Sequence, residues 1–245
     1  VRRDALAPWG GSSTANQFSF VNNELYCGTR GVATIYLENS EIIGNTISVL
    51  PTTAVNTNNY IHGIYITGHF GTLNISGNSI NILEKSNVAG TYVMGIAFAG
   101  NNSTPADVIS VVNNMINVGA SDETGSTYGI GMRSSQNMGN LKVNYNTIVI
   151  NNNASTLTSY AVGSHTNGTG PVNIYFKNNI IINNNNCSIN NNGINYSGIC
   201  GNGNVVDNGG CHVDVVGGTT ARNTTTNNNF NYHNNSRTSI CSNAA

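Results

Sequence analysis

The densest group of side chains suited to acid–base chemistry in this sequence lies toward its carboxyl-terminal end. The segment "DNGGCHVD" contains Asp207, His212 and Asp214. Two carboxylates that flank a sugar linkage can act as acid and base or nucleophile in glycoside hydrolysis, and carboxylates can also hold Ca²⁺. Asp207, His212 and Asp214 are therefore the alternative catalytic residues that the sequence offers.

A structural interpretation explains the same three residues. Asp is common in turns because its side chain bonds to its own backbone two residues on, and His212 can cap the end of a fold. The other aspartates, Asp4, Asp107 and Asp122, are scattered along the chain. We therefore expect no catalytic centre, no metal site and no cofactor.

Four of the five cysteines lie in the same part of the chain, at Cys187, Cys200, Cys211 and Cys241. Their spacings of 13, 11 and 30 residues match no zinc motif, and the sequence has no C-x-x-C. Two disulfides that staple a carboxyl-terminal cap are the simplest interpretation, with three pairings open. Cys27 occupies an apolar position of the pattern described next and is expected to be a buried thiol.

An asparagine recurs inside a fixed apolar pattern. In "LKVNYNTIVI", apolar residues at 141, 143, 148 and 150 flank Asn146 in the order apolar-x-apolar-x-x-Asn-x-apolar-x-apolar. Six segments match this template fully or with one substitution. Their asparagines are Asn23, Asn45, Asn78, Asn114, Asn146 and Asn179, separated from Asn45 onward by 33, 36, 32 and 33 residues.

This period predicts stacked strands. A fixed spacing in this range indicates units that pack on their neighbours, and the apolar period of two within each unit indicates strands. Stacked strands lie about 4.8 Å apart, so the asparagines of successive units are predicted to form a hydrogen-bonded ladder. Such a ladder would satisfy a buried polar group.

A column of small residues follows the template asparagines from Asn45 onward by 14 to 18 residues. Its members are Gly63, Gly95, Gly129, Ala161 and Gly193. We expect these residues to allow a tight turn or a positive φ before the third strand of each unit.

The pattern resembles the right-handed parallel β-helix family, the pectin-lyase-like solenoids. More narrowly, it is similar to the Asn-rich repeat regions of large secreted or surface-anchored bacterial proteins. The resemblance implies an all-β, right-handed parallel β-helix of about six coils over residues 16–210. Residues 1–15 are then expected to be an arm or cap, and residues 211–245 a cap or tail that disulfides staple.

The composition narrows the classes of partner. Charged residues make up 8% of the chain and its formal net charge is −1, which disfavours nucleic acid and anionic membrane surfaces. No apolar run approaches the roughly 18 residues of a membrane span. The chain begins "VRRDALAPWGG", without Met or an apolar signal segment, so we expect a processed product or an excised piece. The charge-poor, Asn- and Thr-rich composition and the placement of the cysteines favour an extracellular or cell-surface origin.

These observations favour a non-catalytic extracellular structural or surface protein, adhesive or assembling into filaments. Val149, Ile180 and Ile182 are predicted to point outward and form a contact patch, and open ends of a stack invite head-to-tail or lateral self-association. The alternative is a carbohydrate-binding or polysaccharide-cleaving β-helix with a glycan partner. A trimeric spike or fibre fragment of the phage type is a third interpretation.

Overall fold

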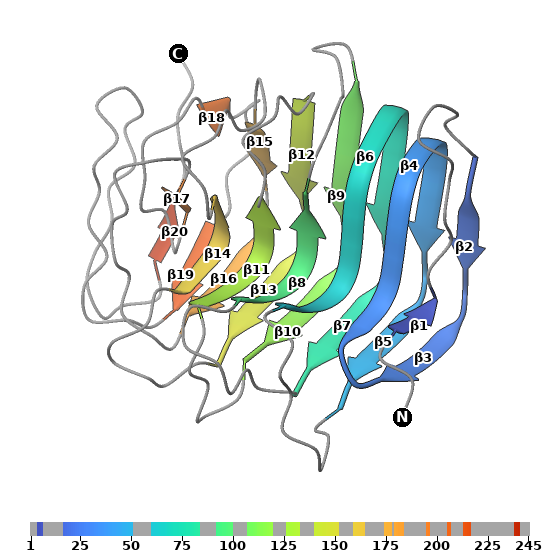
Figure 1. Cartoon of the computed structure of the whole chain (residues 1–245). Coiled ribbons are helices and arrows are strands. Elements are labelled where there is room, and N and C mark those ends of the chain that lie inside the picture. The colour runs from blue at the N-terminus through green and yellow to red at the C-terminus, as the bar shows by residue number, and fades with distance from the viewer. Residues whose placement is uncertain are drawn as a thin grey trace.

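The computed structural model describes a chain of β-strands (Figure 1). The described residues are 4–6, 17–50, 60–83, 92–99, 107–119, 126–132, 140–151, 159–164, 174–177, 179–183, 195–196, 205–206, 213–216 and 238–240. For 4–6, and for most residues after 151, only the backbone is described. Strands are the regular secondary structure of these residues, and no helix occurs among them.

The strands form three strips, and the chain visits the strips in a fixed order. The first strip contains β1 (Asp4–Leu6), the first half of β4 (Arg30–Ile43), the first half of β6 (Tyr60–Ser76), β8 (Tyr92–Phe98), β11 (Ser126–Met132), β14 (Ser159–Ser164) and β17 (Asn195–Tyr196). The second contains β2 (Ser19–Val21), the second halves of β4 and β6, β9 (Val108–Val112), β12 (Asn140–Asn144), β15 (Ile174–Lys177) and β18 (Val205–Val206). The third contains β3 (Glu24–Cys27), β5 (Thr46–Val49), β7 (Ser79–Ile82), β10 (Met115–Val118), β13 (Thr147–Ile150), β16 (Ile180–Asn183), β19 (Val213–Val216) and β20 (Thr238–Ile240).

One passage of the chain through the three strips is called a repeat here. Strands of successive repeats pair in parallel, except β17 against β14, so that Ile80 lies beside Ile116 and Ile116 beside Ile148. Figure 1 shows the strands of the third strip side by side from β3 to β19. The all-β, parallel arrangement is compatible with the β-helix that the sequence pattern predicts.

Alternation along the strands builds one hydrophobic core from all three strips. Ile64 of the first strip, Ile75 of the second and Ile80 of the third are at most 1% exposed and belong to the same cluster. Burying such a side chain contributes roughly 1.5–3 kcal/mol. The core thus ties each strip to the other two.

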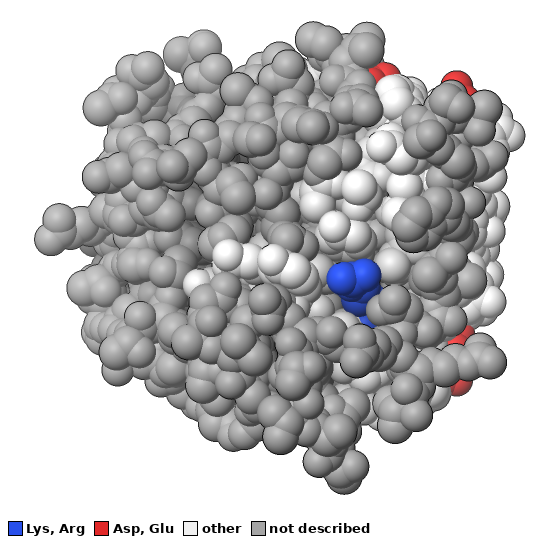
Figure 2. Space-filling view, viewed as in Figure 1, with Lys and Arg blue, Asp and Glu red and all other residues white. Residues whose placement is uncertain are grey.

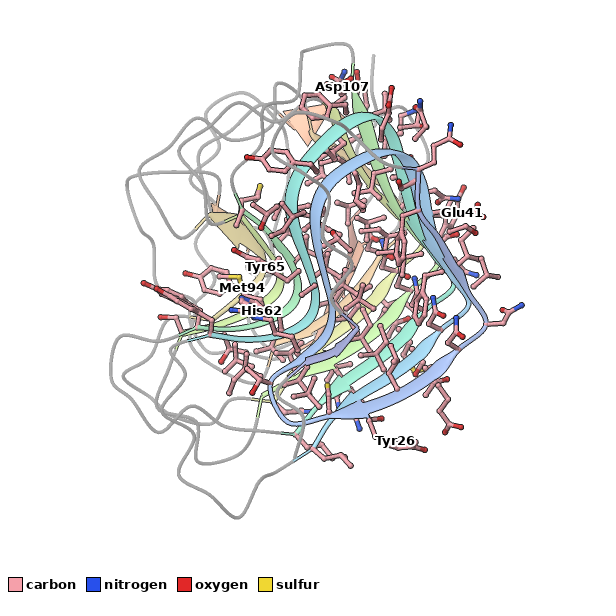
Figure 3. All side chains as sticks on the ribbon, turned by 45° about the vertical axis from the view of Figure 1, so that its right-hand side comes forward. Tyr26, Glu41, His62, Tyr65, Met94 and Asp107 are labelled. Carbon is pink, nitrogen blue, oxygen red and sulfur yellow. The ribbon has the colours of Figure 1, made fainter. Side chains whose placement is uncertain are left out.

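The first and second strips are joined by two long strands. We expected three short strands in each unit, but β4 has 14 residues and β6 has 17, and each bends from one strip into the next (Figure 3). Positive φ angles at Asn39 in β4 and at Gly68 and Gly71 in β6 mark the bends. These residues let the chain change direction without ending the strand.

The described glycines of the column do not have the predicted role of allowing a turn or a positive φ. Gly63 and Gly95 lie inside β6 and β8 and are not among the residues with positive φ. A Cβ built on Gly63 would lie 2.4 Å from Cγ2 of Ile80 and 2.6 Å from the carbonyl oxygen of Gly95. Gly63 and Gly95 are therefore small because the first strip packs closely against the third, and the same holds for Gly31.

Positive φ occurs instead at the residue before each ladder asparagine from Asn23 to Asn146. This position is held by Asn22, Gly44, Gly77, Asn113 and Tyr145, with φ between 56° and 66°. The left-handed residue turns the chain from the second strip into the third. Asn and Gly tolerate this conformation, whereas Tyr adopts it at a cost.

Within the described residues, no helix has the length and apolar character needed to span a membrane.

Candidate functional site

The template asparagines lie one above another at the turn between the second and third strips. The backbone N–H and the Nδ2 group of Asn45 donate to Oδ1 of Asn78 at 2.9 and 3.0 Å. Asn78 donates in the same way to Asn114 at 3.0 and 2.9 Å. The steps from Asn23 to Asn45, from Asn114 to Asn146 and from Asn146 to Asn179 follow the same pattern.

Each internal amide is fully used. Oδ1 of Asn78 accepts the two bonds from Asn45, and Nδ2 of Asn78 donates one bond to Asn114 and one, of 2.8 Å, to the carbonyl oxygen of Ile42. An amide has two acceptor positions and two donor hydrogens, so Asn78 satisfies its whole side chain although it is only 1% exposed.

A second, shorter ladder runs along the outer face of the third strip. Nδ2 of Asn117 donates to Oδ1 of Asn81 at 2.8 Å, and Nδ2 of Asn151 donates to Oδ1 of Asn117 at 2.6 Å. The repeat pattern of the sequence did not predict this ladder. Its signal is an Asn that recurs 36 and 34 residues apart, in a chain where Asn is abundant.

Aromatic side chains form a row on the outer face of the first strip. The rings of Tyr60 and Tyr92 stack with centroids 5.7 Å apart, and those of His62 and Tyr65 stack at 4.8 Å. The guanidinium carbon of Arg30 lies 5.0 Å from the centre of the Tyr65 ring, a cation–π contact. We call Arg30, Tyr60, His62, Tyr65 and Tyr92 the aromatic row.

The aromatic row borders a small apolar cluster that is separate from the main core. Met94, Ala97 and Tyr128 form this cluster, with Tyr65 and Tyr92 packed against it. Figure 3 shows His62, Tyr65 and Met94 on the same side of the ribbon, away from the side chains between the strips. Tyr60, Tyr65 and Tyr92 are partly exposed, so part of the row reaches the surface.

The surface that the structure describes carries little charge. Figure 2 shows basic atoms at one place near the middle of this face and acidic atoms only at its margins. The buried acid Asp107 accepts a hydrogen bond of 2.7 Å from the backbone N–H of Gly71. Its carboxyl group therefore helps to fix the bend of β6.

His69 lies near Asp107 and is fully buried. Burial lowers the pKa of His69 from 6.5 to about 4, although the nearby Asp107 acts in the opposite direction. Neither ring nitrogen has a hydrogen-bond partner among the described residues. His69 is thus neutral in the folded protein near pH 7.

The candidate catalytic residues are largely outside the described part of the chain. Asp207 and His212 lie there, as do the disulfide candidates Cys187, Cys200, Cys211 and Cys241. Asp214 is in β19, where its backbone pairs with Ile180, but its side chain is not described. Cys27 is a buried thiol whose Sγ donates to the carbonyl oxygen of Ser48 at 3.6 Å.

The residues of the predicted contact patch belong to two strands of the third strip, β13 and β16. Val149 is partly buried and pairs with Ile182, whose side chain is not described. Ile180 is 45% exposed, and Met115, in line with it through Thr147, is 59% exposed. Exposed apolar side chains therefore occur in two repeats of this strip.

No group of three or more His, Cys, Asp or Glu side chains suited to a metal ion occurs in the described ranges. Comparison with protein-family models, with curated proteins and with solved structures finds no match for this chain.

Proposed function

We propose that this chain is a right-handed parallel β-helix that acts as a non-catalytic structural module of an extracellular or cell-surface protein. The observation that supports this role most strongly is the asparagine ladder from Asn23 to Asn179. Its buried amide groups donate and accept hydrogen bonds among themselves and with backbone carbonyls. Their hydrogen-bonding capacity is therefore used to hold the repeats together. A stack of this kind is a stiff scaffold.

The outer surface suits such a scaffold. Its exposed positions include Thr46, Thr72 and Asn74, uncharged polar residues that water solvates without ion pairs. The exposed apolar residues Met115 and Ile180 interrupt this polar surface. A patch of this kind is a candidate for adhesion or lateral self-association.

A polysaccharide panel combined with electron microscopy tests the proposal. We expect no reducing ends and no unsaturated products from neutral or acidic polysaccharides, and rod-shaped particles or filaments in negatively stained images. Release of products that stops on Asp207→Ala or Asp214→Ala would overturn the non-catalytic role.

A second candidate function, glycan binding, is favoured by the aromatic row. Tyrosine rings and a guanidinium group offer stacking surfaces and hydrogen-bond donors to sugars, and the buried Nε of Arg30 has no hydrogen-bond partner among the described residues. A glycan array tests this candidate. Binding that is lost on Tyr60→Ala and Tyr92→Ala, but kept on Tyr26→Ala in the third strip, would support it, and no binding by the unaltered protein would reject it.

A further inference from the structure

The asparagine ladder has a direction. At every step the backbone N–H and Nδ2 of one asparagine donate to Oδ1 of the asparagine in the following repeat. Each Oδ1 therefore accepts only from the repeat before it. Asn23 is the first member and is exposed, and no described residue donates to its Oδ1. Among the described residues, the ladder thus starts with an open acceptor.

Backbone hydrogen bonds beside the ladder also leave donors unpaired on the outer side of β3, within the described part of the chain. The residue after each ladder asparagine donates its N–H to the carbonyl oxygen of the preceding ladder asparagine, as Thr46 does to Asn23 and Ser79 to Asn45, both at 2.8 Å. Alternate residues of a parallel strand bond to opposite sides. Glu24 and Tyr26 therefore direct their N–H groups away from β5.

The apolar side chains at this edge are incompletely covered. Phe20 and Leu25 pack against the main core but are only partly buried. Their partners one repeat later, Ile42 and Ile47, are 0% exposed. One more repeat at this edge would cover Phe20 and Leu25 as the first repeat covers Ile42 and Ile47.

The other end of the stack is different. Ile180 pairs with Asp214, so the position that matches Asn179 is held by Val213 and not by an asparagine. The outermost strands there also run antiparallel in two strips, β17 against β14 and β20 against β19. In the described part of the chain, the open ladder acceptor belongs to the edge formed by β1, β2 and β3, which we call the amino-terminal edge.

We infer that the amino-terminal edge is a docking surface for a parallel β-repeat that carries an asparagine at the ladder position. Such a repeat supplies an N–H and an Nδ2 group to Oδ1 of Asn23, carbonyl oxygens to Glu24 and Tyr26, and apolar cover for Leu25. It would make the contact that successive repeats already make within the chain. The inference rests on the proposed β-helix and adds the kind of partner that extends it.

An added repeat tests the inference in the full chain. Residues 92–125, which contain β8, β9 and β10, are duplicated in front of Val1, and hydrogen exchange is measured for the amides of Glu24 and Tyr26. We expect both amides to exchange at least about tenfold more slowly than in the unaltered protein, because the added repeat gives them acceptors. The matched control carries Asn114→Ala in the added copy only, and we expect its protection to be clearly smaller.

Three results would overturn the inference. The first is protection of Glu24 and Tyr26 in the unaltered protein equal to that of Ser79 and Asn81, because the edge would then already be covered. The second is no added protection from the duplicated repeat, and the third is equal protection with and without its asparagine. Exchange at Ile80 reports whether the rest of the stack is intact. Polysaccharide cleavage would reject the proposed structural role without changing these exchange rates.

Discussion

The choice of asparagine at the turn follows from the number of bonds that the site requires. Asn78 must accept two hydrogen bonds from Asn45 and donate two, to Asn114 and to the carbonyl oxygen of Ile42. An aspartate would lack both donors and bury a charge, and alanine would lack all four groups. Glutamine has the same groups on a longer stem, which would move the amide out of the column.

Asn78→Ala is expected to lower the free energy of unfolding by about 3 kcal/mol, because it leaves buried donors and acceptors on neighbouring repeats without partners. Urea unfolding followed by circular dichroism measures the change. Asn74→Ala serves as the control, since Asn74 is an exposed residue of β6 and its loss should change stability by less than about 0.5 kcal/mol. Similar effects of the two substitutions would show that the ladder contributes little.

His69 makes stability depend on pH. Its pKa is about 4 in the folded protein and 6.5 in the unfolded chain. The unfolded chain therefore takes up a proton between these pH values while the folded protein does not. Stability is fully present above about pH 6.5 and falls as the pH drops toward 4. Below pH 4 both states are protonated, and the contribution of His69 no longer changes.

The expected loss from this group across the window is about 3 kcal/mol, since one pKa unit corresponds to about 1.4 kcal/mol. Unfolding free energies measured between pH 7 and pH 5, a range above the ordinary pKa of carboxyl groups, isolate most of the effect. His69→Leu should remove most of this slope. An unchanged slope in that variant would assign the pH dependence to other groups.

At the scale of elements, Gly63 tests how closely the first strip packs on the third. Gly63→Ala places a Cβ against Ile80 and the backbone of Gly95, and overpacking of this kind should cost about 3 kcal/mol. Gly77→Ala is the comparison, because a Cβ there meets nothing closer than 3.9 Å and only the φ of +64° is unfavourable, at a cost of about 1 kcal/mol. Equal losses in thermal or urea unfolding would argue against close packing as the reason for the column.

A substitution at Tyr145, in the turn before Asn146, is expected to stabilise the fold. Tyr145 has a φ of 58°, a conformation that costs ordinary residues about 1 kcal/mol and that asparagine adopts more readily. Tyr145 is 53% exposed, so Tyr145→Asn removes little packing and should raise the unfolding free energy by up to about 1 kcal/mol. Met115→Asn, at an exposed position without positive φ, should give no gain. A loss of stability in Tyr145→Asn would mean that its ring makes a contact worth more than the strain.

The elements differ in how far the sequence predicted them. The apolar register of Ile80, Ile116 and Ile148 was predictable because every repeat fills the same inward positions. The role of Gly63 was not predictable from the sequence. A glycine that is required by close packing of two strips cannot be told, from sequence alone, from a glycine that is required by a turn. The ladder of Asn81 and Asn117 was also not predicted, because the residue type at outward-facing positions varies between repeats.

At the scale of the whole molecule, contacts between neighbouring repeats create features that the sequence alone does not predict. His69 and Asp107 lie 38 positions apart and come together only because one repeat packs on the next. No local pattern marks such a pair. The aromatic row is built in the same way, from Tyr60 and Tyr92 in neighbouring repeats. Sites of this kind become visible only when the register between repeats is known.

The stack should also exchange its amide hydrogens unevenly along its length. Leu25 in β3 and Ile80 in β7 hold matching places in their repeats, but β3 has a neighbouring strand on one side and β7 has one on each side. Terminal repeats in such arrays open more easily because they lack one interface.

We therefore expect the amide of Leu25 to exchange at least about tenfold faster than that of Ile80 in native-state hydrogen exchange at low denaturant. Ile80 and Ile116, which both lie in internal repeats, should differ much less and serve as the internal control. If Leu25 were as protected as Ile80, the stack would open as a single unit, and the amino-terminal edge would gain little from a docked repeat. A gradient that starts at Leu25 would instead identify this edge as the place where added contacts stabilise the molecule most.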